Sequence, residues 1–370
     1  MANNNENKIL NVPHLRFPEF TGEWKKCVLQ DVVAFSNGKA HENCVNENGD
    51  YVLVNSKFVS TNGQVQKRVT SQLSPLCKSQ FVMVMSDLPN GKALAKCYYI
   101  EDDHKFTLNQ RICSFTAKDR NISRFLMYQI NRNKYYMRFD DGINQTNLKK
   151  SEVLSCPVFI PSIHEQEKIA TMLHLLDERI ATQTKIIDKL QSLIKGLAVA
   201  LTTKGKPNIA ISQCLECHSS TLQESEVLPN GLYKVFGANG LVGYTDVPQM
   251  SSDAILVIKD GSGVGTVSYA QGKFSVIGTL NYLTAIGNID LRYLYFALSV
   301  FNFQPYKTGM AIPHIYFKDY GKAKIYCPPL AEQKHVANVL GKLESKLFVE
   351  QGLLASFNQQ KQYLLGQMFI

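Results

Sequence analysis

The sequence predicts an α+β protein: two tandem globular domains of mixed α/β structure, each followed by one long helix. Three observations lead to this prediction. Residues 163–201 and 330–370 carry apolar residues in a heptad pattern. The second stretch repeats the first at an offset of 167 residues. The segments that precede the two stretches contain short β-branched and aromatic runs, which are typical of strands.

Length and composition fit this class. A chain of 370 residues with 45% hydrophobic residues can bury two or three cores. The net charge of +9 allows binding to a polyanion without requiring it. Nine cysteines without a framework, no signal peptide and no apolar run of about 18 residues indicate a reduced, cytoplasmic protein without a membrane segment.

The first domain contains strand-like runs followed by a helical pattern. The only tryptophan, Trp24, lies in a proline-containing segment that we expect to be pinned to the domain surface. The runs YVLVNSKFV, QFVMVMSDL, ALAKCYYI and ICSFTA predict strands. A helical face follows at Ile122, Phe125, Leu126, Gln129 and Ile130.

The first long helix has a seam of heptad positions and signals at both ends. Ser162 and Glu165 have the spacing of a capping box, and Gly205 with Pro207 marks the stop. At about 1.5 Å per residue the helix is about 60 Å long, which suits a strut. Its seam positions are Ile169, Leu173, Leu176, Ile180, Gln183, Ile187, Leu190, Ile194, Leu197 and Leu201.

The second long helix shares this register. Pro328 and Pro329 precede it, and the polar break at Gln183 recurs as Glu350. Its seam positions are Val336, Leu340, Leu343, Leu347, Glu350, Leu354, Phe357, Lys361, Leu364 and Met368.

The repeat continues upstream of the helices. No gap is needed from residue 121 to 201, and Tyr128 corresponds to Tyr295. Further upstream the offset drifts: FTL at 106 corresponds to FSV at 274, Asp87 to Asp260, and GDY at 49 to GLY at 231. A constant scaffold with loops of variable length is expected of variable recognition, although neutral drift predicts it nearly as well.

Several phrases resemble one protein family along essentially the whole chain. LRFPEFTGEW near the start, GINQTNL and GMAIPHIYFKDY at the end of each globular domain, and the helix starts SIHEQEKIATML and PPLAEQKHVANVL are similar to the specificity (S) subunit of type I restriction-modification systems. Two departures stand out. Residues 202–230 contain no second LRFPEF-like phrase, and SIHEQ replaces the more usual PPLEEQ in the first copy.

The resemblance implies a non-catalytic DNA-reading subunit. It places the first target recognition domain at 1–160, a central helix at 161–203, the second target recognition domain at 204–327 and a C-terminal helix at 328–370. Each domain would read one half of a bipartite asymmetric site, and the helices would pair as an antiparallel coiled coil that sets the spacer. Antiparallel packing would make Gln183 and Glu350 neighbours.

The resemblance also implies the partners. They are double-stranded DNA, two methyltransferase (M) subunits that dock beside the helices, and restriction (R) subunits in systems that have them. No cofactor is expected in this chain, because S-adenosylmethionine, ATP and Mg²⁺ belong to the partner subunits. Catalysis is likewise expected only there.

A basic cluster in the first domain supports DNA binding independently. Clustered cations displace counterions from phosphates, and the interleaved Tyr135 and Tyr136 offer stacking surfaces. Only one acid, Asp119, interrupts the cluster. A solvated helix face is the simpler alternative for any one of these residues. The basic residues are Arg111, Lys118, Arg120, Arg124, Arg132, Lys134 and Arg138.

The phrase NQTNLKK adds groups that can read bases. Gln145 and Asn147 are of the type that reads adenine, and Lys149 with Lys150 can hold phosphate, although such amides also cap turns. The counterparts in the second domain are chemically different, as two different half-sites would require. The further DNA-contact candidates are Gly142, Lys259, Gly263, Lys307, Gly309, His314, Tyr316 and Lys318.

Other motifs give weaker alternatives. DGSGVGTV at 260–267 has neither Walker nor dinucleotide spacing, so we predict a glycine-rich hairpin, with close approach to DNA as the minor alternative. CLECH at 214–218 lacks further metal ligands. The functional alternatives are a coiled-coil tethering or scaffold protein, an enzyme that binds nucleotide at residues 260–267, and an S subunit of a related bifunctional restriction system.

Overall fold

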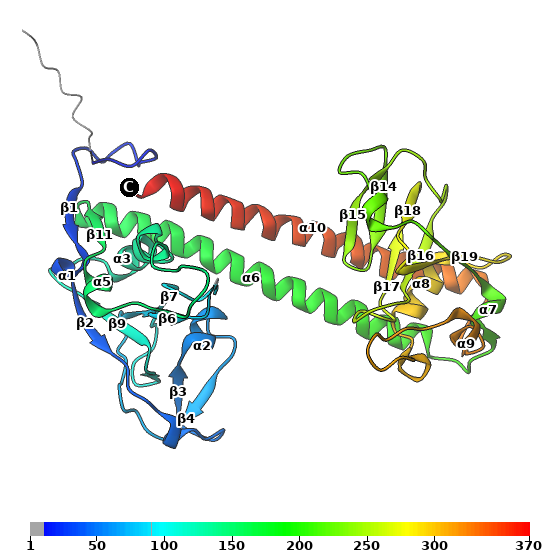
Figure 1. The fold of residues 1–370 in the computed structure, drawn as a ribbon, viewed down its shortest axis with the longest axis horizontal. Coiled ribbons are helices and arrows are strands. Elements are labelled where there is room, and N and C mark those ends of the chain that lie inside the picture. Colours follow the sequence, from blue (N-terminus) through cyan, green and yellow to red (C-terminus); the bar gives the residue numbers. More distant parts are fainter. Residues whose placement is uncertain (1–10, 90) are drawn as a thin grey trace, which may run out of the picture. The chain divides into compact units, whose positions relative to one another are not determined.

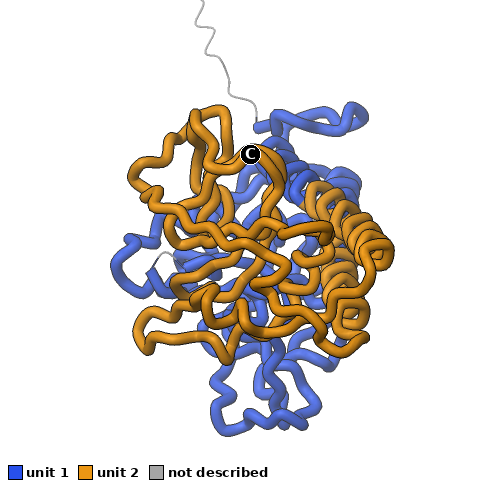
Figure 2. The backbone as a smooth tube through the Cα atoms, turned by 90° about the vertical axis from the view of Figure 1, so that its right-hand side faces the viewer, with its two compact units in different colours: residues 1–181, 355–370 blue, residues 182–354 orange. Residues whose placement is uncertain are grey.

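The computed structural model describes residues 11–89 and 91–370. The chain forms two compact units (Figure 2): unit 1 comprises residues 1–181 and 355–370, and unit 2 comprises residues 182–354. Residues 1–10, which open the domain predicted over 1–160, lie outside the described residues. The division passes through both long helices, so the boundaries predicted at 160, 203 and 327 stay predictions.

Unit 1 is built on two small sheets and two strand pairs (Figure 1). Its strands are β1 Lys25–Val28, β2 Val33–Asn37, β3 Tyr51–Val54, β4 Lys67–Val69, β5 Phe81–Val84, β6 Ser86–Asp87, β7 Cys97–Tyr99, β8 Phe106–Leu108, β9 Ile112–Ala117, β10 Thr146–Asn147 and β11 Pro157–Ile160. The sheet orders are β2–β9–β5–β7 and β4–β3–β8, and the pairs are β1–β11 and β6–β10. Its short helices are α1 Leu29–Val32, η1 Glu42–Cys44, α2 Ser56–Ser60, α3 Ser123–Ile130, α4 Lys134–Met137 and α5 Lys150–Leu154.

Unit 2 repeats this topology. Its strands are β12 Ile209–Ala210, β13 Leu215–Ser219, β14 Tyr233–Gly237, β15 Gly240–Thr245, β16 Ala254–Ile258, β17 Val267–Ala270, β18 Phe274–Val276, β19 Leu280–Ala285 and β20 Lys324–Ile325. The sheet orders are β13–β19–β16–β17 and β15–β14–β18, and β12 pairs with β20. Its short helices are α7 Ile211–Cys214, η2 Glu224–Glu226, α8 Leu291–Ser299, η3 Gln304–Tyr306 and α9 Phe317–Tyr320.

The strand registers bear out the predicted repeat. Val52 pairs with Phe106 in the parallel β3–β8 ladder, and Lys234 pairs with Phe274 in the parallel β14–β18 ladder. These two pairs are related by the offsets of 182 and 168 that the sequence predicts. The two units therefore share one fold, including the position of the parallel pair.

The central strand of each larger sheet is buried on both faces, which explains its continuous apolar run. In β5, Phe81 and Met83 pack in the cluster that contains Phe125 of α3. Val82 and Val84 face a second cluster, which lies against the smaller sheet. In β16 the side chains divide between two clusters in the same way.

One predicted strand is partly wrong. The run YVLVNSKFV forms strand only over β3, and Ser56–Ser60 forms helix α2. Asn55 accounts for the change, because its side-chain oxygen accepts a hydrogen bond from Phe58 N at 2.8 Å. This N-cap bond satisfies a backbone donor of the first helical turn, which favours helix over strand.

The two long helices are α6 Ile163–Thr202 and α10 Leu330–Met368. In unit 1, Met368 and Leu364 near the end of α10 pack with Ile169 near the start of α6. In unit 2, Ala198 near the end of α6 packs with Leu340 near the start of α10. The predicted antiparallel pairing is therefore confirmed (Figure 1). Within the described residues no helix is long and apolar enough to cross a membrane.

The seam positions predicted for both helices are all buried or half-buried. The two polar residues that interrupt the seams are in direct contact. Gln183 Nε2 donates to Glu350 Oε2 at 2.5 Å and to the Glu350 carbonyl at 3.0 Å. The prediction that these two residues are neighbours is confirmed. Since each is the other's counterpart at the offset of 167, the contact lies where the two repeats meet.

The start of α6 differs from the predicted capping box. Ser162 Oγ accepts from Glu165 N at 3.3 Å, as expected. The Glu165 carboxylate, however, forms an ion pair with Arg16, with Nε at 2.7 Å, and accepts from Trp24 Nε1 at 3.3 Å. Trp24 is 2% exposed and packs in the core of unit 1, so its side chain anchors the segment that carries it.

A buried glutamine joins each globular part to the helix that follows it. Gln166 Oε1 accepts from Ile122 N at 2.9 Å, and its Nε2 donates to the Pro161 carbonyl at 3.1 Å. Gln333 makes the same two bonds, from Asp290 N at 2.9 Å and to the Pro328 carbonyl at 2.7 Å. The repeated Glu-Gln dipeptide thus marks a structural joint present in both units.

Candidate DNA interface

A group of polar side chains gathers where β6 and β10 pair in unit 1. We call Ser86, Arg111, Gln145 and Asn147 corner 1. Asn147 lies opposite Ser86 in the ladder. Ser86 Oγ donates to Asn147 Oδ1 at 2.6 Å and accepts from Gln145 Nε2 at 2.8 Å. One serine hydroxyl therefore holds both amides in place.

Arg111 lies beside these hydrogen-bonded side chains. It lines one open pocket together with Ser86 and Asn147. Its φ of 66° is in the left-handed region, which is uncommon for residues other than glycine. No hydrogen bond or ion pair engages its guanidinium within residues 11–89 and 91–370. Corner 1 therefore presents a cation and two amides to solvent.

The equivalent place in unit 2 holds different side chains. We call Lys259, Asp260, His314 and Tyr316 corner 2. Asp260 and His314 are paired through their backbones in an isolated antiparallel β-bridge. The rings of His314 and Tyr316 meet edge to face, with their centroids 5.3 Å apart. Among the described residues the Asp260 carboxylate has no hydrogen-bond or ion-pair partner. Corner 2 therefore presents a carboxylate and an imidazole.

The backbone shows that the two corners are equivalent. In unit 1, Met85 N donates to the Arg111 carbonyl at 2.9 Å, and Leu148 N donates to the Met85 carbonyl at 2.8 Å. In unit 2, Lys259 occupies the place of Met85. Its backbone N donates to the Thr279 carbonyl at 3.0 Å, and its carbonyl accepts from Ile315 N at 3.0 Å.

These bonds fix the local offset between the units. Ser86, and not Asp87 as expected, corresponds to Asp260, so the predicted alignment was one residue off at this point. Sequence reasoning did not select Ser86 or Asp260 as site residues. The available signal was that a buried apolar strand ends in a polar pair in both repeats.

The basic cluster predicted between residues 111 and 138 is not one patch. Arg111 precedes β9 and Lys118 follows it, so the six residues of the strand separate them by about 20 Å. Lys118 Nζ donates to the Gln30 carbonyl at 2.9 Å. Arg132 donates to the Gly91 and Leu94 carbonyls, both at 3.3 Å. Arg120, like Arg132, has a left-handed backbone and is exposed.

Aromatic partners hold other members of this cluster. Arg138 stacks on Tyr135, with its guanidinium carbon 4.0 Å from the ring centroid. Lys134 opens α4 and is exposed. Tyr136 is fully buried and belongs to the core. Arg124 lies 3.9 Å over Tyr99 and pairs with Glu101, which makes it a structural residue.

The remaining candidates lie close to the corners in sequence. Lys149 and Lys150 follow corner 1 at the start of α5, where Lys150 lies 5.3 Å over Phe35. In unit 2, Lys318 lies 5.2 Å over Tyr316, and Lys307 precedes the turn that contains Gly309. Gly142 and Gly309 both have a positive φ, of 70° and 85°. Their contact with DNA stays a prediction.

The glycine-rich loop connects β16 to β17, which form an antiparallel pair, so the predicted hairpin is confirmed. Gly261 N donates to the Pro313 carbonyl and Gly265 N to the Ile258 carbonyl, both at 2.9 Å. These backbone donors are already used, which argues against a phosphate cradle. Gly263 lies at the tip, where a Cβ would meet only Ile258 within 3.5 Å.

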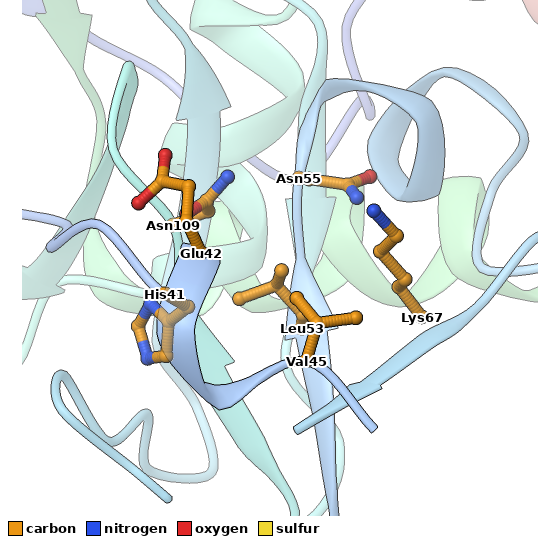
Figure 3. A pocket seen from close by; sticks show the side chains of 7 residues that line it. All are labelled: His41, Glu42, Val45, Leu53, Asn55, Lys67 and Asn109. Atoms are coloured by element: carbon orange, nitrogen blue, oxygen red, sulfur yellow. The ribbon is translucent and has the colours of Figure 1, made fainter. Parts of the chain in front are cut away.

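A second open pocket lies in unit 1 on the other side of the β8–β9 turn (Figure 3). Glu42 and Asn109 line one side of it, and Asn55 and Lys67 line the other. His41 is buried and lies 2.9 Å from Thr107 Oγ1, so it has a structural partner.

No cluster of three or more His, Cys, Asp or Glu side chains that could hold a metal ion is found in the part of the chain that the structure describes. In CLECH, burial raises the pKa of Cys214 to about 12 and that of Cys217 to about 11. His218 stacks on Tyr282 with ring centroids 5.1 Å apart. These residues pack in the β13–β19 region.

Comparison with known families decides the identity of the chain. The family model described as "Type I restriction modification DNA specificity domain" matches residues 21–192 and again residues 215–359. The chain belongs to this family. The resemblance predicted from the sequence is therefore confirmed, and the two matches correspond to the two repeats. Specificity subunits of this family are generally non-catalytic.

Known relatives agree with the family. A type I restriction enzyme EcoprrI specificity subunit from Escherichia coli is 22% identical over 114 residues, which cover 31% of this chain and 28% of that relative. The chain thus matches less than a third of the relative's length.

Two solved structures share the fold. The S subunit of a type I restriction-modification system from M. genitalium has a TM-score of 0.71 at 18% identity, covering 97% of this chain and 99% of that chain. A chain from a study of complex assembly and conformational transition of the type I R-M system has a TM-score of 0.51 at 15% identity, covering 92% and 96%.

Proposed function

We propose that this chain is the DNA-specificity subunit of a type I restriction-modification complex and reads a bipartite asymmetric site. Each unit reads one half-site, with phosphate contacts for affinity and base-edge contacts for sequence. The observation that carries this proposal is the pair of corners: equivalent backbones present different polar side chains. Two different readers on one chain suit an asymmetric site, whereas a symmetric dimer would need a palindrome.

The paired helices set the spacer between half-sites in this proposal. A heptad seam with a single polar break gives one preferred register. The spacer would then be a fixed number of base pairs.

The helices also offer a surface to methyltransferase subunits. Catalysis, and with it S-adenosylmethionine, ATP and Mg²⁺, belongs to the partner subunits of the complex. On α10, Phe348, Val349 and Leu353 are 77%, 59% and 44% exposed. Large apolar side chains exposed side by side on a helix are typical of a partner-binding surface. The partner must extrude its target adenine from the duplex to methylate it.

The decisive experiment is to co-express the chain with a candidate methyltransferase and map methylated adenines genome-wide. We expect a split motif with two different halves and a fixed spacer. Methylation without any motif would contradict the proposal. A specificity subunit of a related bifunctional system would give the same motif and differ only in the chains that copurify.

The spacer role has its own test. Deleting one heptad from α6 together with its counterpart from α10 shortens the coil by about 10.5 Å, or about three base pairs of B-DNA. We expect a correspondingly shorter spacer in the methylation motif or loss of methylation, because the half-sites also rotate about the DNA axis. An unchanged spacer would exclude the ruler role.

A further inference from the structure

We propose, resting on the function proposed above, that corner 1 reads an A·T base pair and corner 2 reads a C·G base pair in the DNA major groove. The donor and acceptor atoms that each corner leaves unpaired carry this assignment. Ser86 and Asp260 are the residues that decide it.

Ser86 fixes which atoms face outward in corner 1. Its hydroxyl accepts a hydrogen bond from Gln145 Nε2 at 2.8 Å and donates one to Asn147 Oδ1 at 2.6 Å. One atom of each amide is therefore held by the protein. Gln145 Oε1, an acceptor, and Asn147 Nδ2, a donor, have no partner among residues 11–89 and 91–370. Both amides are exposed, whereas Ser86 is 7% exposed, so Ser86 is a positioning residue.

A fixed donor beside a fixed acceptor is complementary to adenine. In the major groove adenine offers the N7 acceptor next to the N6 donor, whereas guanine offers two acceptors and cytosine a single donor. Asn147 Nδ2 would donate to N7 and Gln145 Oε1 would accept from N6. Two side chains thus act together as one asparagine or glutamine does in a bidentate contact with adenine.

Corner 2 presents acceptors instead. The Asp260 carboxylate can only accept hydrogen bonds. His314 Nδ1 lies 3.0 Å from the Ile312 carbonyl. Because a carbonyl can only accept, Nδ1 carries the hydrogen and Nε2 of the neutral ring is left as an acceptor.

A carboxylate acceptor favours a C·G pair. Cytosine offers the N4 donor, which a carboxylate accepts. Adenine fits less well, because its N7 lone pair would face an acceptor. The chemical difference between the corners therefore predicts different base pairs at equivalent places in the two half-sites.

The test uses the full chain co-expressed with the methyltransferase and compares methylation motifs of wild type, Ser86→Ala and Asp260→Asn. Ser86→Ala releases both amides, so the preference for A·T at one position should fall about tenfold or more. Asp260→Asn replaces one acceptor oxygen with a donor, so the preference for C·G should fall by a similar factor in the other half-site.

Matched controls are available in both units. Ser60 donates only to the Lys57 carbonyl within α2, and Asp246 is exposed in the turn after β15. Ser60→Ala and Asp246→Asn should leave both half-sites unchanged. If a corner variant abolishes methylation, the affinity of the purified complex for duplexes carrying each of the four base pairs replaces the motif as the readout.

The outcomes separate the two proposals. A wild-type complex without a motif would overturn the proposed function and the base assignment together. A clear wild-type motif that both corner variants leave unchanged would overturn the base assignment alone. The base assignment alone would also be overturned if both variants lost sequence preference in the same half-site. An equal loss of affinity for all four base pairs would overturn it too.

Discussion

Corner 1 and corner 2 stand on the same backbone hydrogen bonds and have no site side chain in common. The positions of Ser86, Arg111 and Asn147 in unit 1 correspond to those of Asp260, Thr279 and His314 in unit 2. Arg111 supplies a cation at corner 1, whereas its counterpart in unit 2 is the uncharged Thr279. The comparison shows that the scaffold fixes where a side chain stands but not its chemistry.

The joints between globular part and helix show the opposite behaviour. Gln166 and Gln333 make the same two bonds in both units. Tyr128 donates to Asp177 at 2.6 Å, and Tyr295 donates to Glu344 at 2.7 Å. Burial and the nearby carboxylate raise the pKa of each tyrosine. Features that hold the helix are repeated, whereas features exposed at the strand ends are not.

The largest effect is expected from breaking this shared joint. Gln166→Leu or Gln333→Leu leaves a buried backbone N–H and a carbonyl without partners, at about 1–3 kcal/mol for each group. We expect each variant to lose about 2–6 kcal/mol of unfolding free energy. Trp24, the only tryptophan, lies in unit 1, so its fluorescence follows the unfolding of the Gln166→Leu variant. Circular dichroism follows the unfolding of both variants.

Exposed glutamines on the same helices provide the control. Gln191 on α6 and Gln360 on α10 are both exposed, so their replacement by leucine should change stability by less than about 0.5 kcal/mol. A large loss for Gln166→Leu with none for Gln333→Leu would show that the two joints are not equivalent.

Much of the scaffold could be predicted from the sequence because its signals are local and occur twice. The heptad seam predicts the helix pair, and the offset of 167 predicts that Gln183 meets Glu350. The errors arose where a distant residue decided the structure. Arg16 and Trp24 bind the Glu165 carboxylate from about 150 positions away in the chain, so the local capping box was only half correct.

The corners could be predicted only in part. Gln145, Asn147 and His314 were selected from their chemistry, but Ser86 and Asp260 were not. A polar residue after a buried strand looks like an ordinary turn residue. Only the register between strands far apart in sequence shows that Ser86 lies opposite Asn147. The basic cluster is likewise not one patch, because Arg111 and Lys118 stand at opposite ends of β9.

A smaller effect is expected where the two repeats meet. Gln183 is 7% exposed and bonds to the Glu350 carboxylate, so Gln183→Leu alone should cost about 1–2 kcal/mol. The double variant Gln183→Leu/Glu350→Leu should recover most of this loss, because replacing both partners by apolar groups is nearly neutral. A double-mutant cycle by urea unfolding measures the coupling.

The sign of that coupling is informative. Recovery in the double variant indicates that the polar pair adds specificity of register and little stability. A double variant less stable than either single variant would contradict this interpretation. It would show that the centre of the coil depends on the hydrogen bond itself.

The smallest effect concerns thiol chemistry and leaves the fold intact. In unit 1, Cys77 is exposed, whereas in unit 2 burial raises the pKa of the half-buried Cys217 to about 11. The thiolate is the reactive form, and at pH 8 a thiol with a pKa of about 11 is only about 0.1% ionised. Iodoacetamide at pH 8 should therefore label unit 1 at Cys77 well before it labels Cys217.

The pH dependence separates protonation from access. Because its pKa is raised, Cys217 should gain reactivity about tenfold per pH unit between pH 8 and pH 10. Cys113 is fully buried, so its labelling should instead follow unfolding. Mass spectrometry of tryptic peptides measures all three sites, and Cys77→Ser should remove only the fast label. If Cys217 reacted as fast as Cys77 at pH 8, the environment of β13 would have to be more open than its packing indicates.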